Sequence, residues 1–292
     1  MHRSKNIVTG VDFSEQSRNA LTEAARVAEW NQAKLRLVNV VEAEAVRHLA
    51  VHEGRDVEEL RAELTRESQT TLQEWATALN LQSRVSERVR FGDAADEVLG
   101  QVKEVGAELL VVGVTGLADD SPGAGAQATR LVRSAPCDVL LVNKNHEGPF
   151  NRVAAGIDFS PTSREAVEKS LRIAQQDDSE VLFIHVYSAP WRRLHLPRSH
   201  KYSSEFRADY VTKLETELRE FVGDLGGVRA SFHLVQNQKH GRGMSGFAQE
   251  QQADLLVVGA RGRSKLGYML LGSTAEYLLR EQPCSVLTIR PK

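Results

Sequence analysis

The sequence repeats itself at an offset of 146 residues, which is half of its 292-residue length. The segment Ile7-Val-Thr-Gly-Val-Asp-Phe-Ser14 returns as Val153-Ala-Ala-Gly-Ile-Asp-Phe-Ser160. The segment Glu108-Leu-Leu-Val-Val-Gly113 returns as Asp254-Leu-Leu-Val-Val-Gly259. Each copy has the size of an ordinary domain and is large enough to bury its own core. The sequence therefore predicts two similar domains in tandem.

The domain boundaries follow from a short polar segment between the copies. Residues 143–151 contain a Gly-Pro pair and suit a linker, so the expected domains are residues 1–145 and 151–292.

Composition excludes several classes of function. With 41% hydrophobic residues and a net charge of −2, the chain has no general attraction for nucleic acid or anionic membranes. Aromatic residues make up only 6%, which disfavours base-stacking surfaces. No apolar run approaches the ~18–20 residues that span a bilayer. No secretory signal is evident near Met1, and there are only two cysteines, so we expect a cytoplasmic protein.

Both halves alternate short apolar strands with stretches of helical spacing. The predicted strands are residues 6–11, 34–41, 84–90, 108–112 and 139–142, then 152–157, 180–187, 229–235, 254–258 and 286–289. The order β-α-β-α-β-α-β-α-β, found twice, predicts an α/β fold with two tandem, doubly wound parallel-sheet domains of five strands each. In such sheets, ligands bind beyond the carboxyl ends of the strands at a topological switch point.

The loop after the fourth predicted strand of the second half has the composition of a phosphate-binding loop. Gly259, Gly262 and Gly272 let backbone N–H groups approach phosphate oxygens closely. Ser273-Thr274 then begins a predicted helix, whose N-terminus favours an anion. Three cationic residues belong to the same loop, namely Arg261, Arg263 and Lys265. The competing interpretation is a surface turn with a capping box formed by Ser273 and Glu276, which would leave the glycines and cations unexplained.

This pattern resembles the ATP-binding form of the universal stress protein family. That form has Gly-x-x-Gly, nine residues and Gly-Ser/Thr, which matches Gly259, Gly262, Gly272 and Ser273. The resemblance covers nearly all of both halves and implies a fold similar to the adenine nucleotide alpha hydrolases. The ligand it implies is ATP, alone or with Mg²⁺.

The resemblance also implies roles for individual residues. Asp158, after the first strand of the second half, would lie near the ribose or adenine. The backbone around Val186 would hold adenine, and Ser273 and Thr274 would contact phosphate. The complete set of expected nucleotide-binding residues is Gly156, Asp158, Val186, Val258, Gly259, Gly262, Arg263, Gly272, Ser273 and Thr274.

The first half keeps Asp12 but has lost the loop. Its segment from Gly113 to Gly125 is one residue shorter, and Ala126 stands where the second half has Ser273. The cations are missing and two aspartates, Asp119 and Asp120, are present instead. A triphosphate would experience a large electrostatic difference between the halves. We therefore expect a degenerate nucleotide site in the first half, although a small ligand remains possible there.

Three further patterns favour structural interpretations. Gly241-Arg-Gly243-Met-Ser-Gly246 matches a dinucleotide fingerprint, but no acid follows the next strand, so we expect a flexible turn entering a helix. The basic stretch 191–201 is interpreted as a solvated loop, with a lid over the nucleotide as the alternative. Cys137 and Cys284 precede matching strands and are expected to be small buried residues.

The sequence thus predicts an ATP-binding regulator with one nucleotide in its second half, an unidentified protein partner and no metal site. The alternatives are a slow ATPase or other nucleotide-handling enzyme, for which no general base is evident, and a scaffold that binds no nucleotide. Each half ends in an apolar strand that should be covered, so the resemblance implies an intrachain pseudo-dimer through these strands. The chain would then be a monomer or would form a homodimer through another surface.

Overall fold

The computed structural model describes residues 4–81, 84–115, 123–193, 203–261 and 271–291. The chain forms two compact units, residues 1–147 and 148–292. Among the described residues, no helix combines the length and hydropathy needed to cross a membrane.

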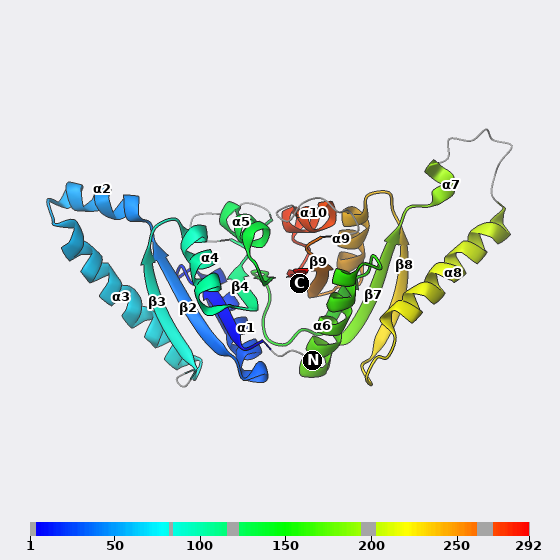
Figure 1. The fold of residues 1–292 in the computed structure, drawn as a ribbon, viewed down its shortest axis with the longest axis horizontal. Coiled ribbons are helices and arrows are strands. Elements are labelled where there is room, and N and C mark those ends of the chain that lie inside the picture. The colour runs from blue at the N-terminus through cyan, green and yellow to red at the C-terminus, as the bar shows by residue number, and fades with distance from the viewer. Residues whose placement is uncertain (1–3, 82–83, 116–122, 194–202, 262–270, 292) are drawn as a thin grey trace. The chain divides into compact units, whose positions relative to one another are not determined.

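The N-terminal unit is a parallel sheet in the order β3-β2-β1-β4-β5 with helices on both faces (Figure 1). Its elements are β1 (Asn6–Gly10), α1 (Glu15–Asn31), β2 (Lys34–Val41), α2 (Ala43–Glu53), α3 (Val57–Ala78), β3 (Val85–Phe91), α4 (Ala94–Val105), β4 (Leu109–Gly113), α5 (Ala126–Ser134) and β5 (Asp138–Val142). Helix α2 lies in a segment for which the sequence predicted no element. Only Val46 and Ala50 of this helix are buried, so its apolar periodicity is weak.

The C-terminal unit repeats this topology in the order β8-β7-β6-β9-β10, again all parallel. Its elements are β6 (Arg152–Gly156), α6 (Pro161–Asp177), β7 (Glu180–Tyr187), α7 (Pro190–Arg193), α8 (Ser204–Val222), β8 (Ala230–Gln236), α9 (His240–Glu250), β9 (Leu255–Gly259), α10 (Ser273–Glu281) and β10 (Ser285–Ile289). The predicted fold class of two doubly wound five-stranded sheets is confirmed. The basic stretch begins in the short helix α7, and residues 194–202 lie outside the described residues.

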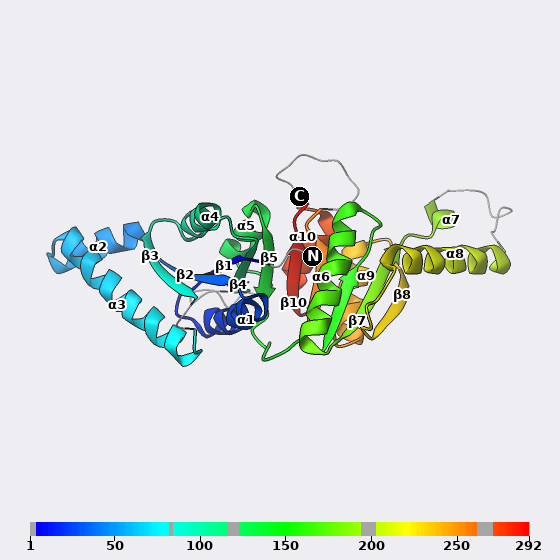
Figure 2. The same ribbon diagram turned by 60° about the horizontal axis from the view of Figure 1, so that its bottom comes forward.

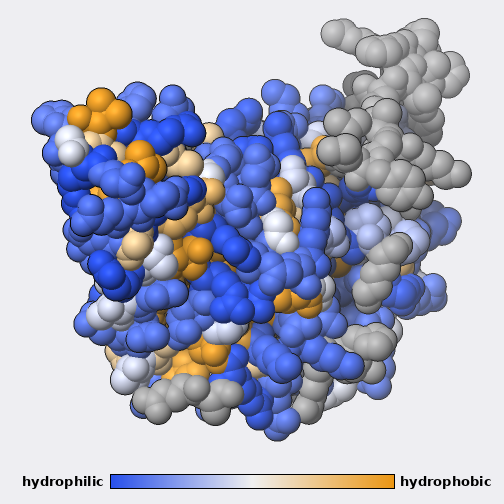
Figure 3. Space-filling model, turned by 60° about the vertical axis from the view of Figure 1, so that its left-hand side comes forward, coloured by the Kyte–Doolittle hydropathy of each residue, from blue (hydrophilic) through white to orange (hydrophobic). Residues whose placement is uncertain are grey.

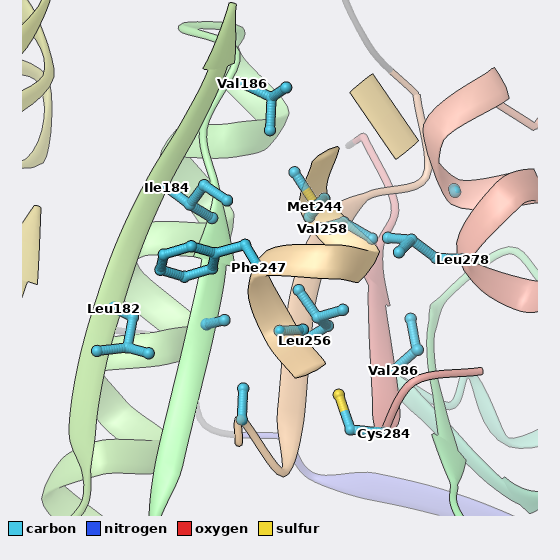
Figure 4. Packing of buried hydrophobic residues seen from close by; sticks show 14 residues of the cluster. Leu182, Ile184, Val186, Met244, Phe247, Leu256, Val258, Leu278, Cys284 and Val286 are labelled. Atoms are coloured by element: carbon cyan, nitrogen blue, oxygen red, sulfur yellow. The ribbon is translucent and has the colours of Figure 1, made fainter. Parts of the chain in front are cut away.

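Helices cover both faces of the C-terminal sheet because its inner strands are apolar on both sides. Along β7, Leu182, Ile184 and Val186 belong to the core beneath α9 and α10 (Figure 4). The alternating residues Val181 and Phe183 pack on the opposite face with α6 and α8. Successive strand residues point to opposite faces, so two cores on one strand require the continuous hydrophobic run that the sequence contains.

The outer face of the N-terminal unit, with α2 and α3, is mostly hydrophilic, and hydrophobic residues are interspersed among hydrophilic ones (Figure 3). Val51 of α2, at 81% exposure, and the less exposed Leu49 of the same helix are examples. Figure 2 turns the ribbon so that α1 and α3 can be followed along the same face of this unit's sheet. Scattered apolar residues of this kind are normal on a protein surface and indicate no particular partner.

Candidate nucleotide site

The candidate site of the C-terminal unit lies at the carboxyl ends of β6 and β9. These strands are neighbours, and the strand order reverses between them, so their ends form the switch point at which doubly wound sheets bind ligands. Asp158 follows β6 and the glycine loop follows β9. The backbone N–H of Gly272 donates to the Ala260 carbonyl oxygen (2.9 Å), so the loop returns to the place where it began.

Asp158 is held in a tight turn before α6. Its Oδ1 accepts a 3.0 Å hydrogen bond from the Ser160 backbone N–H, and the Ser160 hydroxyl in turn caps α6 by accepting from the Ser163 N–H. Pro161 occupies the first helical position, as the sequence predicted. Phe159, between Asp158 and Ser160 in the sequence, has a backbone φ of 63°, which is uncommon for a bulky residue. The turn thus fixes the backbone and leaves the half-buried Asp158 side chain at the sheet edge.

A second strand supports the same turn. His185 of β7 donates from Nδ1 to the Ile157 carbonyl oxygen at 2.7 Å, since a carbonyl can only accept. The His185 ring also packs against Phe159, with ring centroids 4.7 Å apart. In the N-terminal unit, Asn39 makes the equivalent bond to Val11 at 2.8 Å. Both units therefore have a side-chain hydrogen bond to the carbonyl oxygen of the residue before the aspartate, although the donor is histidine in one and asparagine in the other.

The start of α10 differs from the capping box that the competing interpretation of this loop requires. The N-cap residue is Gly272 rather than Ser273, and glycine has no side chain with which to cap the helix. Ser273 and Thr274 are instead the first two helical residues, one exposed and one half-buried. The capping-box interpretation was therefore wrong. A helix that begins after glycine lacks the usual N-cap side chain, and its N-terminus carries a partial positive charge that favours an anion.

Gly259 has a steric reason to be glycine. A Cβ atom there would lie 2.8 Å from the Arg261 carbonyl oxygen and 3.1 Å from the Thr162 side chain. Glycine therefore permits the tight exit from β9. The predicted site residues Gly262 and Arg263, together with Lys265, lie outside the described residues.

Val186 and Val258 contribute to the site in a different way from the polar residues. Their side chains are 5% and 3% exposed and belong to the core between the sheet and α9 (Figure 4). Only their backbone groups are therefore available to a ligand at the strand ends.

Sequence reasoning missed Met244, a residue of α9 in this core. A Cβ atom on Gly156 would lie 2.5 Å from Met244 Cε and 2.9 Å from its Sδ. The Met244 side chain therefore covers the last residue of β6, immediately before the Asp158 turn. A comparison of the two copies could have identified Met244, because the equivalent residue at an offset of 146 is the smaller Val98.

The dinucleotide-like pattern is part of helix α9 and not a turn before it, which corrects the sequence-based expectation. A Cβ atom on Gly241 would lie 2.6 Å from Tyr277 Cβ, and one on Gly243 would lie 2.8 Å from Val186 Cγ1. These two glycines thus allow α9 to pack closely on α10 and β7.

Cys137 and Cys284 are both buried and in no disulfide, as expected. Burial raises the pKa of the Cys284 thiol to about 12, which disfavours thiolate chemistry. Among the described residues, no group of three His, Cys, Asp or Glu side chains could hold a metal ion.

Two doubly wound α/β units in tandem, each with a five-stranded parallel sheet, define the class of protein. The sequence profile of the universal stress protein family matches the chain twice, at residues 3–143 and 149–290. The chain belongs to the universal stress protein family.

Individual relatives agree with this assignment. A universal stress protein of Staphylococcus haemolyticus is 32% identical over 140 residues, which is 47% of this chain and 84% of that protein. One from Methanocaldococcus jannaschii is 26% identical over 148 residues, covering 50% of this chain and 86% of that protein.

Solved structures share the fold over the whole chain. A universal stress protein from Archaeoglobus fulgidus aligns with 99% of each chain at 17% identity and a TM-score of 0.68. A functionally unknown protein from Pseudomonas aeruginosa PAO1 aligns with 99% of this chain and 93% of its own, at 18% identity and a TM-score of 0.67.

Proposed function

We propose that this protein binds ATP in its C-terminal unit and acts as a nucleotide-dependent regulator in the stress response. The observation that carries the proposal is the N-terminus of α10, with glycine at its N-cap position, which follows the glycine loop at the sheet edge where Asp158 also lies. Family membership and the glycine spacing support the same ligand.

Within this proposal, each residue type has a distinct task. The Asp158 carboxylate accepts hydrogen bonds from ribose hydroxyls, which are uncharged donors. The backbone at Val186 and Val258 borders the base, as does that of Gly156 at the end of β6. Phosphate oxygens are bound by the N–H groups of the loop and of α10, from Gly259 and Gly262 to Gly272, with the Ser273 and Thr274 hydroxyls adding donors. Arg263 and its neighbouring cations neutralise phosphate charge.

Mg²⁺ would accompany ATP rather than bind beforehand. The described part of the chain offers no cluster of three acidic, histidine or cysteine ligands. Mg²⁺ commonly retains water and is bound through substrate phosphates, so the nucleotide itself would provide most of its ligands.

The regulatory part of the proposal requires that ATP change an equilibrium. A ligand shifts a protein between two states only by the difference of its affinities for them. The loop and the start of α10 would provide that difference because they contact the nucleotide directly.

Native mass spectrometry of freshly purified protein tests the ligand, and calorimetric titration with ATP tests the stoichiometry. We expect a co-purified adenine nucleotide mass and one ATP site per chain. Two equivalent sites per chain would contradict the assignment to the C-terminal unit. A preparation that neither carries nor binds any adenine nucleotide would support the non-binding scaffold instead.

A further inference from the structure

The N-terminal unit contains a cavity of about 480 Å³ at the carboxyl ends of β1 and β4. This volume falls within the ~300–1,000 Å³ typical of small-molecule sites. Apolar side chains form most of the walls, including Val38, Ala95, Val98, Val112, Val114 and Leu131. The cavity occupies the position in this unit that the candidate nucleotide site occupies in the other.

The cavity is open because of one substitution within the repeat. A Cβ atom on Gly10 would have no neighbour nearer than Val112 Cγ1 at 3.5 Å, with Val98 Cγ2 at 3.7 Å. At the equivalent Gly156, the nearest atom is Met244 Cε at 2.5 Å. Val98 is the counterpart of Met244, so its shorter side chain leaves space above the end of β1.

The polar part of the cavity has the wrong charge for a nucleotide. The lining includes the carboxylates of Asp12 and Glu42, and none of its described residues is Lys, Arg or His. The counterparts in the C-terminal unit are basic or hydroxyl residues at four lining positions. These pairs are Glu42 and Ser188, Ala94 and His240, Thr115 and Arg261, and Ala126 and Ser273. The two sites have therefore diverged in charge.

The Asp12 carboxylate is fixed in place. Its Oδ1 accepts hydrogen bonds from the Ser14 backbone N–H at 3.0 Å and from the Ser14 hydroxyl at 2.6 Å. Both bonds hold the carboxylate in one orientation at the end of β1. The N-terminus of α5 contributes a partial positive charge of only about 0.5, which is less than the charge of the two carboxylates together.

We propose that the N-terminal unit binds a small apolar amine. The hydrocarbon part would lie between the valine, alanine and leucine side chains, where it is removed from water. The ammonium group would lie toward Asp12 and Glu42, where charge-assisted hydrogen bonds are stronger than neutral ones. This site is separate from the proposed ATP site and does not depend on it.

Three probes with the same aromatic body but different head groups test the proposal on the full chain. These are 2-phenylethylamine, 2-phenylethanol and 3-phenylpropionate, measured by saturation-transfer NMR and calorimetric titration. We expect the amine to bind about 10-fold or more tightly than the alcohol, and the carboxylate to bind least. A preference for the carboxylate, or no binding of any probe, would overturn the proposal.

Two variants test whether the amine binds in this cavity. Val98→Met introduces the residue that the C-terminal unit carries at the same position, so it should fill the cavity and abolish amine binding. Asp12→Asn keeps an acceptor for Ser14 but removes the charge, so the amine should lose about 10-fold in affinity while the alcohol is unaffected. The control Ser273→Ala, in the other unit, should leave amine binding unchanged.

Unchanged amine binding in both N-terminal variants would also overturn the proposal, because the probe would then bind elsewhere. Circular dichroism establishes whether Val98→Met is folded. If it is not, Asp12→Asn and Glu42→Gln decide the question. Loss of the preference for amine over alcohol supports the proposal, and a retained preference refutes it.

Discussion

The Met244 side chain covers the backbone of Gly156, such that a Cβ atom on Gly156 would lie only 2.5 Å from Met244 Cε. Gly156 ends β6 at the switch point, two residues before Asp158. A nucleotide that approaches the end of β6 must therefore share this space with a thioether. Methionine is flexible and can change rotamer at modest cost, so Met244 is a candidate determinant of affinity.

We expect Met244→Val to strengthen ATP binding, because the nucleotide would no longer displace the longer side chain. The same change should lower the free energy of unfolding by about 1–2 kcal/mol, since Met244 belongs to the buried core. Calorimetric titration and urea unfolding measure the two effects. Met244→Leu, of similar volume, is the control and should change neither greatly. Weaker ATP binding in Met244→Val would show that the thioether is part of the nucleotide's binding surface.

The two equivalent aspartates provide a matched test of the asymmetry between the units. Asp158 and Asp12 both accept a 3.0 Å bond from a backbone N–H, of Ser160 and Ser14 respectively, and Asp12 also accepts from the Ser14 hydroxyl. We expect Asp158→Ala to weaken ATP binding by about 1–3 kcal/mol, the cost of losing a hydrogen bond to a charged group. Asp12→Ala should leave ATP affinity unchanged. Equal losses in the two variants, by calorimetry, would refute the asymmetry.

The glycines of α9 should respond differently to the same substitution. Gly241→Ala should destabilise the protein, because the new methyl group would lie 2.6 Å from Tyr277 Cβ. Gly246 has no atom within 4 Å of an added Cβ, so Gly246→Ala should stabilise the protein by about 0.5–1 kcal/mol through helix propensity. Thermal unfolding of both variants tests this. Similar effects of the two changes would contradict the packing role of Gly241.

The fold could be predicted from the sequence because the determining signals are local and occur twice. Strand runs such as Leu255–Gly259 and helix starts such as Ser160-Pro161 lie in contiguous sequence, and the repeat shows that both copies share one topology. Helix α2 was missed because it buries only two residues. The end of α9 nearest the site was misread because Gly241 and Gly243 also suit a loop, and only the contacts with Tyr277 and Val186 explain them.

The candidate site could be predicted only in part. Asp158 and Gly259 were identified because they follow strand ends, which meet at one edge of a parallel sheet. Met244 was not, because it reaches Gly156 from a helix that is distant in sequence. The helix start at Ser273 was predicted, and only the competing interpretation placed an N-cap there, because residue type alone does not determine where the first helical turn begins.

The stability of the C-terminal unit should depend on the protonation of His233. Burial lowers the pKa of His233, with nearby Glu180 partly opposing the shift, and Ser231 Oγ lies 2.8 Å from its Nε2. Because the folded-state pKa is lower than the unfolded value of about 6.5, the unfolded chain binds the proton first as the pH falls. The contribution of neutral His233 to the free energy of unfolding should therefore be complete above the unfolded-state pKa. It should be lost as the pH falls through the folded-state pKa. Urea unfolding between about pH 7 and pH 5 should show a smaller decline in His233→Gln, and an identical decline would contradict this role.

The last strand of each unit is expected to find a partner. Strand β5 pairs with β4 and β10 with β9, so each ends its own unit's sheet. Apolar edge strands are usually paired or covered, and we predict that these two strands pair antiparallel as an intrachain pseudo-dimer. Pro291 lacks an N–H and would limit the length of this pairing.

Charged replacement of Val286 is a poor test of this pairing, because Val286 belongs to the core of its own unit. A protease site inserted at Gly148, where the backbone has a φ of 73°, tests it without disturbing either core. After cleavage the two halves should co-elute in size-exclusion chromatography, and the backbone amides of β5 and β10 should remain protected from hydrogen exchange. Separation of intact, folded halves would contradict this pairing.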